Sequence, residues 1–171
     1  MNRRELLGTH EFDVNERRQP HTAKSGIVAV FNGEPRILIL TRSLEDSYRP
    51  GGADLPGGTL YIVSPTELED PQVCAAREAW EEAHLNLAVE RFRPVNFSFE
   101  QTSETEVYRH GYYALISEEE AVQVRLSEEH HEGAFYTETQ AHELLQGHPA
   151  WIEVTQAAFR ASREAHGIQA A

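Results

Sequence analysis

Three glutamates occupy five consecutive positions in the segment REAWEEAH, residues 77–84. If this segment is helical, Glu78, Glu81 and Glu82 stand at i, i+3 and i+4, and their side chains emerge on one face. Each like-charge pair at this spacing costs about 0.2–0.5 kcal/mol, and a bound cation would offset that repulsion. The pattern therefore indicates either a metal-binding carboxylate cluster or a solvated acidic surface, and the surrounding residues must distinguish the two.

The residues before the glutamates carry the signals of a helix start. Asp70 suits the N-cap, and Pro71 suits the first helical position, where its missing N–H leaves no hydrogen bond unmade. We expect a helix over residues 71–83. On the side opposite the glutamates, the residues expected to pack against the core are Val73, Ala76, Ala79, Trp80 and Ala83.

A glycine-containing loop, PGG at residues 56–58, lies upstream of this helix, where a backbone can turn sharply and approach a ligand closely. Together with Glu69, eight residues before Arg77, and with REAWEEAHL, this loop resembles the Nudix box, G-x5-E-x7-REU-x-EE-x-GU with U aliphatic. The residues in register with the box are Glu69, Arg77, Glu78, Ala79, Glu81, Glu82 and Leu85. The chain is therefore identified as a member of the Nudix hydrolase family.

The resemblance implies hydrolysis of the pyrophosphate bond in a nucleoside diphosphate linked to another moiety, with Mg²⁺ or Mn²⁺ as cofactor and water as the attacking group. It assigns metal binding to Glu78, Glu81 and Glu82, with the Gly58 carbonyl as a further ligand. Such hard oxygen donors suit Mg²⁺. A solvated acidic surface does not explain why the rest of the box is present.

The resemblance also suggests roles for residues that do not bind the metal. Arg77 is expected to orient the glutamates rather than contact substrate, and Glu69 is expected to support the ligands from behind. The general base is either a glutamate of the box or an acidic residue of a later loop. In EEHHEGAF, residues 128–135, we favour Glu132 over Glu129 for that role.

Two features depart from the family pattern. Ten residues, TLYIVSPTEL at 59–68, separate Gly58 from Glu69 where the box has five, so the loop carries an insertion of about five residues. We expect this insertion to line the substrate entrance. His84 replaces the glycine that ends the helix, and a histidine in the left-handed conformation has a steric cost that glycine avoids.

The remaining sequence reads as strands followed by helices. SGIVAVF and PRILILT predict strands near 25–31 and 36–41 around an Asn32-Gly33 turn. A short extended piece at 53–56, loop over most of 57–69, a second hairpin within 86–100 and 106–116, and a short strand at 134–137 complete the expected β structure.

Two helices are expected near the end of the chain. A capping box of Thr137 and Gln140 opens a helix through Leu145, which Gly147 closes, and Pro149 begins the last helix. The apolar stripe of this last helix consists of Trp151, Val154, Thr155, Ala158 and Phe159. We therefore expect an α+β fold, a Nudix-type α/β/α sandwich with a mixed sheet, with an N-terminal arm at 1–22 and the hydrolase domain at 23–171.

Composition limits the partners. A net charge of −13 argues against a nucleic acid polymer, and no apolar run is long enough to span a membrane. With one cysteine and a polar N-terminus, a cytoplasmic protein is expected. The expected partner is a small-molecule nucleotide substrate, and the N-terminal arm is a candidate element for a homodimer.

Other interpretations of single features are weaker. Glu81-x-x-His84 and Glu128-x-x-His131 fit the spacing of di-iron helical bundles, but the hairpin turn and the strand-like segments oppose a bundle. Cys74 is expected to be a small packed residue. A nucleotide-binding sensor or scaffold without catalysis is the alternative function, which the complete set of box glutamates opposes. Among substrates, ADP-ribose or nucleotide sugars are favoured over nucleoside triphosphates and coenzyme A because the enlarged loop could enclose a second sugar.

Overall fold

The computed structural model describes residues 20–169 except 46–48, 65 and 102–105. Its strands are β1 (His21–Phe31), β2 (Glu34–Arg42), β3 (Ala53–Asp54), β4 (Gly57–Thr59), β5 (Ile62–Ser64), β6 (Glu67–Leu68), β7 (Arg93–Gln101), β8 (Glu106–Leu115) and β9 (His130–Tyr136). Its helices are α2 (Pro71–Ala83), the short 3-10 helix η2 (Val89–Arg91), α3 (Glu118–Ala121), α4 (Glu138–Leu144) and α5 (Pro149–His166). None of these helices is long and apolar enough to cross a membrane.

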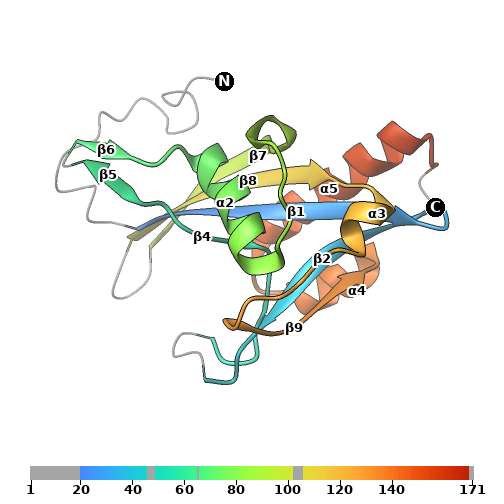
Figure 1. Cartoon of the computed structure of the whole chain (residues 1–171), viewed down its shortest axis with the longest axis horizontal. Coiled ribbons are helices and arrows are strands. Elements are labelled where there is room, and N and C mark those ends of the chain that lie inside the picture. Colours follow the sequence, from blue (N-terminus) through green and yellow to red (C-terminus); the bar gives the residue numbers. More distant parts are fainter. Residues whose placement is uncertain (1–19, 46–48, 65, 102–105, 170–171) are drawn as a thin grey trace.

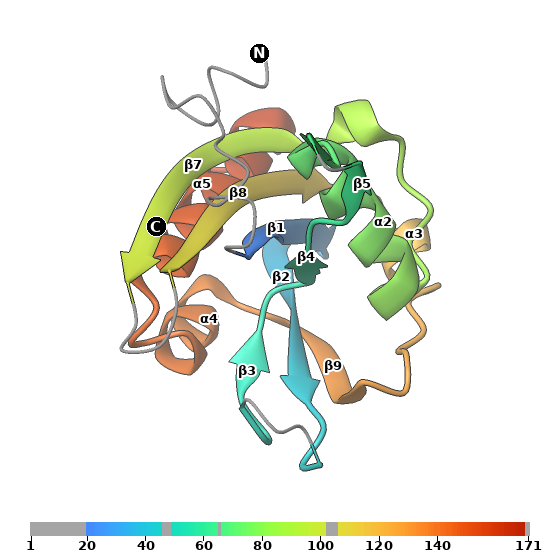
Figure 2. The ribbon, with the colours of Figure 1, turned by 90° about the vertical axis from the view of Figure 1, so that its left-hand side faces the viewer.

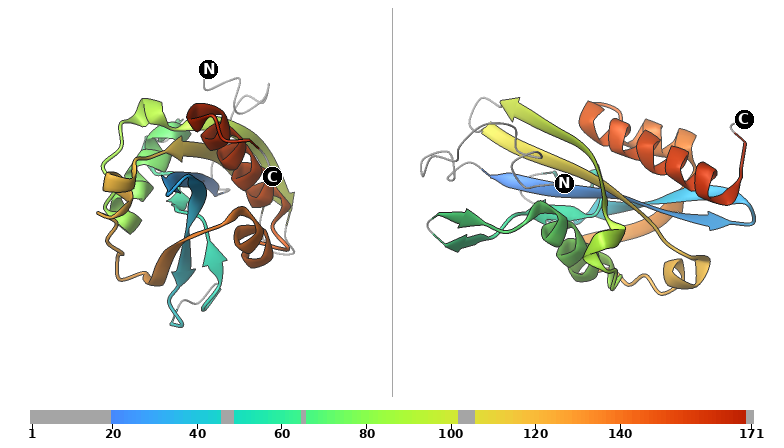
Figure 3. Two further views of the ribbon diagram at one scale, coloured as in Figure 1. Left: turned by 90° about the vertical axis from the view of Figure 1, so that its right-hand side faces the viewer. Right: turned by 90° about the horizontal axis from the view of Figure 1, so that it is seen from above.

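The main sheet is mixed. Its strands run in the order β3-β2-β1-β8-β7, with β4 added to β1 and β9 added to β2 (Figure 1). Strands β1 and β8 are parallel, whereas the other pairs are antiparallel. The sheet curves, and helices lie on both of its sides (Figures 2 and 3). This arrangement confirms the expected α+β sandwich with a mixed sheet.

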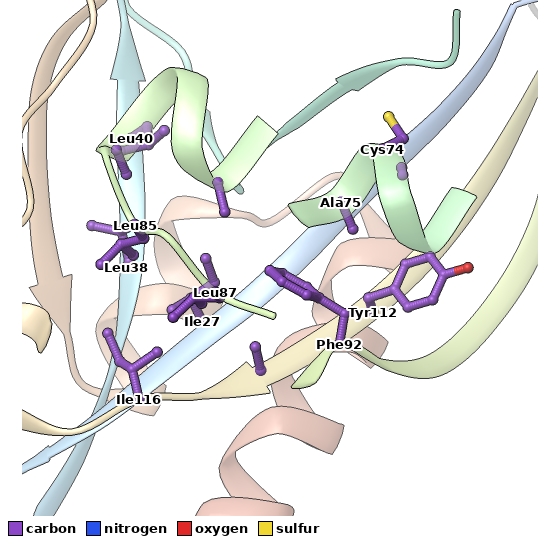
Figure 4. Packing of buried hydrophobic residues seen from close by; sticks show 14 of the residues in the cluster. Ile27, Leu38, Leu40, Cys74, Ala75, Leu85, Leu87, Phe92, Tyr112 and Ile116 are labelled. Carbon is purple, nitrogen blue, oxygen red and sulfur yellow. The ribbon is translucent and has the colours of Figure 1, made fainter. Parts of the chain in front are cut away.

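Alternation along β1 and β2 divides the core into two layers. In β2, Leu38 and Leu40 pack in the layer beneath α2, which Figure 4 shows, and Ile37 and Ile39 pack in the layer beneath α5. Because successive strand residues point to opposite faces, a continuous apolar run is what a sheet covered on both sides requires. The expected stripe of α5, including Trp151 and Phe159, is confirmed as buried.

Helix α2 confirms the predicted bounds, but the predicted packing face is wrong at two positions. Trp80 and Val73 are exposed, whereas Cys74 and Ala75 are buried in the core. The helix packs through its small residues because it lies close against β1 and β4, where large side chains would not fit. Burial raises the pKa of the Cys74 thiol, which accords with a packed rather than reactive residue.

The expected loop at 57–69 contains three short strands, so that expectation is wrong. Strand β4 pairs with β1, while β5 and β6 form a separate hairpin that projects beyond one end of the sheet (Figure 1). Strand β9 is also longer than expected and begins at residue 130. Strand β1 begins at His21, inside the expected arm, and residues 1–19 of that arm lie outside the described part of the chain.

Candidate active site

The local sequence fixes where α2 presents its glutamates. The Asp70 side chain accepts a hydrogen bond from the Gln72 N–H at 2.8 Å, and Pro71 occupies the first turn, as expected. At the other end, His84 adopts the left-handed conformation with φ 55°, and its N–H reaches the Ala79 and Trp80 carbonyls. The helix thus has defined ends, and the glutamates lie in its last two turns.

The glutamates differ in exposure. Glu78 and Glu82 are buried, with 8% and 6% of their surface exposed, whereas the Glu81 side chain is 44% exposed. Two carboxylates are thus withdrawn from water although only part of their charge is compensated by neighbouring groups. A solvated acidic surface does not describe them, because ionised groups are rarely buried without a partner.

Arg77 connects three of the expected site residues. Its Nε and Nη2 each donate to one carboxylate oxygen of Glu69 at 2.9 Å, and its Nη1 donates to Glu78 Oε1 and Glu81 Oε2 at 2.7 Å. Nη2 also reaches the Thr59 carbonyl at 3.1 Å. This planar, multidentate arrangement is specific to a guanidinium and holds the glutamates in a fixed relation to the β4 strand.

Glu69 fixes the orientation of the Arg77 guanidinium. Besides the two bonds from Arg77, it accepts a hydrogen bond from the Tyr61 N–H at 3.1 Å. Burial raises the Glu69 pKa, but the hydrogen bonds from Arg77 and Tyr61 outweigh that effect and leave the pKa below its ordinary value. Glu69 therefore stays ionised and keeps Arg77 oriented.

The charge of Glu82 is less well compensated by its neighbours than the charge of Glu69. Glu82 Oε2 accepts a hydrogen bond from the Gly57 N–H at 3.0 Å, and His130 Nε2 lies 3.9 Å from Oε1. Burial raises its pKa to about 8, against the opposing effects of Lys24 and the Gly57 N–H. Burial likewise raises the pKa of Glu78, although Arg77 opposes it. Both carboxylates would gain from a further cation.

The two glycines of the PGG loop serve different purposes. Gly57 has φ +154°, and a Cβ placed there would lie 2.0 Å from the Ala23 carbonyl oxygen, so the close pairing of β4 with β1 requires glycine. At Gly58, an added Cβ would instead lie 2.3–2.9 Å from the carboxylate atoms of Glu78. The Gly58 backbone therefore approaches the carboxylate itself.

We expect Gly58→Ala to lower kcat/KM by roughly tenfold, the scale seen when the support of a metal ligand is disturbed. The methyl group would push the Glu78 carboxylate aside, which a flexible side chain permits, so Tm should fall little. Gly57→Ala is the contrasting variant, because its clash is with backbone and should lower Tm markedly. Thermal melts and steady-state kinetics on both variants distinguish the positions, and an unchanged kcat/KM for Gly58→Ala would contradict this role.

The donors present suit a divalent metal. Buried carboxylate oxygens and a backbone carbonyl are hard ligands of the kind that Mg²⁺ and Mn²⁺ prefer, and the raised pKa values of Glu78 and Glu82 indicate missing positive charge. In the described part of the chain, no three acidic, histidine or cysteine side chains converge closely enough to hold an ion by themselves. Arg77 is the cation that Glu78 and Glu81 share in this structure.

The titration of Glu82 predicts how stability without metal depends on pH. With its pKa raised to about 8 in the folded state, this carboxyl holds its proton more tightly when folded, so its stabilising effect is full at acidic pH and is lost as pH rises through 8. We expect the Tm of Glu82→Gln minus the Tm of wild type to increase by about 5 °C or more as the pH is raised from 5 to 8.5. Thermal melts in chelator would show this difference, and a gap that stays constant with pH would contradict it.

A cavity of about 800 Å³ opens beside the carboxylates. Glu78, Glu81, Glu82, Arg77 and Gly58 line one part of it. The residues that line it from elsewhere in the fold, and that the sequence did not single out for the site, include Lys24, Arg42, Asp54, Arg109 and Trp151. This volume lies within the usual range for a small-molecule pocket.

The later acidic segment reaches this cavity through Glu129, not Glu132. Glu129 lines the cavity, whereas Glu132 is exposed in β9 and does not line it. The pairing of β9 with β2 shifts register between Thr41 and Arg42, so strand alternation does not carry Glu132 to the side on which His130 faces Glu82. Of the two candidates for the general base, the structure brings Glu129 and not Glu132 to the cavity.

Comparison with known proteins identifies the fold. The family model of the NUDIX domain matches residues 20–159. The Ap4A hydrolase of C. elegans, in a binary complex, is 21% identical with a TM-score of 0.64, covering 84% of this chain and 98% of that one. The NUDIX domain of Shewanella oneidensis NrtR complexed with ADP ribose is 15% identical with a TM-score of 0.64, covering 92% of this chain and 98% of that one. No curated protein sequence matches the chain.

Proposed function

The chain belongs to the NUDIX domain family, and we propose that it is a divalent-metal-dependent pyrophosphohydrolase acting on a nucleoside diphosphate linked to another moiety. The observation that carries this proposal is the pair of buried carboxylates, Glu78 and Glu82, beside the glycine backbone at the edge of a ligand-sized cavity. Two buried carboxylates are costly unless a cation offsets their charge, and a bound divalent metal would supply that cation.

The chain's own residues would divide the work as follows. Glu78, Glu81, Glu82 and the Gly58 carbonyl would hold Mg²⁺ or Mn²⁺. Arg77, fixed by Glu69, would orient the glutamates. When bound, the metal would neutralise the diphosphate and lower the pKa of the attacking water. Glu129 would take a proton from that water, and its position in the lining of the same cavity supports this role.

ADP-ribose or a nucleotide sugar is the favoured substrate, ahead of nucleoside triphosphates and coenzyme A. The size of the cavity and the complex of a structurally similar NUDIX domain with ADP ribose support this ranking. The alternative function is a nucleotide-binding sensor without catalysis. The presence of every box carboxylate supports the enzyme over the sensor.

A substrate panel tests the proposal. The purified chain would be incubated with ADP-ribose, UDP-glucose, ATP and coenzyme A, with and without Mg²⁺ or Mn²⁺, and the products resolved by mass. We expect metal-dependent release of a nucleoside monophosphate, with ¹⁸O from water in only one product. Tight nucleotide binding without metal-dependent cleavage would favour the sensor instead.

The β5–β6 hairpin is expected to influence substrate choice. Tyr61, at its base, lines the cavity and lies over the Arg77 guanidinium at 3.8 Å from the ring centroid, while Ile62 and Val63 are exposed. Deleting residues 62–66 keeps Tyr61. The deletion should change KM, or the ratio of kcat/KM between two substrates, by about tenfold, the value of a modest pocket contact. Metal affinity, measured by titration, should change much less. An unaltered ranking across the panel would remove the hairpin from substrate recognition.

A further inference from the structure

Lys24 is the only lysine in the chain, and its side chain lines the cavity with 10% of its surface exposed. Its Nζ donates hydrogen bonds to Asp54 Oδ2 at 2.8 Å, to the Gly57 carbonyl at 3.2 Å and to the Leu55 carbonyl at 3.4 Å. An ammonium group has three protons, so these three acceptors match its full capacity as a donor. Lys24 is therefore occupied by the protein itself and has no proton left for a substrate phosphate.

Strand β1 holds the backbone that leads into the PGG loop. Lys24 donates to the carbonyls of Leu55 and Gly57. The Ser25 N–H donates to the carbonyl between these two, at 2.9 Å. Gly57 also faces Lys24 directly in the pairing of β4 with β1, and a Cβ at this glycine would lie 2.8 Å from Lys24 Cδ. The lysine stem thus packs on the glycine backbone, and three successive carbonyls before Gly58 are fixed by β1.

The same backbone contacts the carboxylates of α2. The Gly57 N–H donates to Glu82 Oε2 at 3.0 Å, and the Gly58 backbone lies close against the Glu78 carboxylate. The carbonyl and the N–H of one residue, Gly57, thus bond to Lys24 and to Glu82. A shift of this residue would displace the Gly58 carbonyl, an expected metal ligand, relative to both glutamates.

Asp54 holds the ammonium in this position. Its side chain is 4% exposed, and its Oδ2 also accepts a hydrogen bond from Arg42 Nη1 at 3.2 Å. A buried ion pair contributes little to stability, because desolvation cancels much of the attraction between the charges. Stability alone therefore does not account for the pair of Lys24 with Asp54, whereas a compact ammonium with three fixed acceptors sets a defined local geometry.

We propose that Lys24 is a positioning residue, whose ammonium sets the place of the Gly57–Gly58 backbone against the glutamates of α2. It acts through that backbone and does not contact the substrate. Groups that hold the ligands of a metal in place typically contribute about 10- to 100-fold to metal affinity or activity. The inference rests on the proposed function and deepens it, because the backbone that Lys24 fixes belongs to the expected metal site.

Two other roles for this lysine lead to different predictions. Burial raises the Glu82 pKa, and Lys24 is the strongest effect that opposes it, so the charge of the ammonium acts on that carboxylate. If this charge were its whole effect, its removal would tighten the binding of a divalent cation, because like charges repel. If the ammonium bound a substrate phosphate, its removal would raise KM and leave metal binding no weaker. Positioning instead predicts weaker metal binding.

Lys24→Met separates these roles, because it removes the ammonium and keeps an unbranched stem, while Asp54 retains Arg42 as its partner. Mn²⁺ binding would be measured without substrate from the electron paramagnetic resonance signal of free Mn²⁺. We expect the Kd for Mn²⁺ to rise about tenfold or more. At saturating Mn²⁺, kcat for ADP-ribose should fall about tenfold with KM changed less than about threefold, since no direct substrate contact is lost.

Two further variants complete the test. Lys24→Gln keeps two N–H donors without the charge, on a shorter stem, and should weaken Mn²⁺ binding at least about threefold even if Lys24→Met folds poorly. Arg36→Met is the matched control, since Arg36 pairs with Glu34 in the β1–β2 hairpin and does not line the cavity. Its Kd for Mn²⁺ should equal that of wild type.

The outcomes separate the positioning role from the hydrolase. Weaker Mn²⁺ binding in the Lys24 variants, with no turnover of any substrate by wild type, would keep the positioning role and overturn the proposed hydrolysis. Unchanged or tighter Mn²⁺ binding in these variants, or an equal loss in Arg36→Met, would overturn the positioning role, and turnover by wild type would still support the hydrolase. If wild type binds no Mn²⁺, both proposals are wrong.

Discussion

Replacing Glu82 with glutamine is expected to lower kcat/KM by at least about 10³-fold, because loss of a metal ligand removes several kcal/mol of transition-state stabilisation. The fold should remain intact. Glutamine keeps the shape of the side chain, and its amide oxygen can still accept the hydrogen bond that the Gly57 N–H donates to Glu82 at 3.0 Å. Burying an amide in place of a carboxylate should also leave the metal-free Tm unchanged or higher.

The loss of activity must be separated from loss of structure and from general charge effects. Glu90→Gln makes the same chemical change at an exposed position in η2 that does not line the cavity, and it should retain wild-type activity. Circular dichroism and thermal melts would confirm that both variants fold. A Glu82→Gln enzyme with wild-type turnover in Mg²⁺ would show that Glu82 is not a metal ligand.

The site elements that could be predicted from the sequence are those set by local signals. The Asp70 cap, Pro71 and the spacing of the glutamates lie within fifteen residues, and the structure confirms the helix at 71–83. The contact of Arg77 with Glu81 follows from the same register, because Glu81 lies four positions further along the helix. The contact with Glu78, the next residue, does not follow from helical periodicity. Local sequence signals therefore predict the part of the cavity wall that α2 forms.

Other features depend on tertiary structure, which local patterns do not encode. Trp80 was expected to pack because helical spacing places it on the side opposite the glutamates, yet the close approach of α2 to β1 and β4 selects Cys74 and Ala75 instead. Lys24 and Asp54 come from separate strands and meet only when β1 and β3 are brought together by the fold. A lysine directly before the apolar segment SGIVAVF was the available signal.

The position of the later acidic loop also escaped prediction. Glu129 and Glu132 lie three residues apart and have the same chemistry, so sequence alone offered little to choose between them. Glu129 lines the cavity and Glu132 does not, and the pairing of β9 with β2 shifts register between these two residues, opposite Thr41 and Arg42. Such irregularities in pairing often occur next to functional sites, where they redirect a side chain.

Glu129→Ala is therefore expected to lower kcat by about 10²–10⁴-fold, the usual contribution of a positioned general base. Glu132→Ala is the matched control, because it removes the same charge three residues away at a position that does not line the cavity. Because an exposed charge outside the cavity contributes little, Glu132→Ala should alter kcat less than about threefold. Steady-state kinetics in saturating Mg²⁺, with metal affinity measured separately, would distinguish a base from a ligand. If both variants keep wild-type kcat, the base must be sought among the glutamates of α2, and Glu81, the most exposed of them, becomes the first to test.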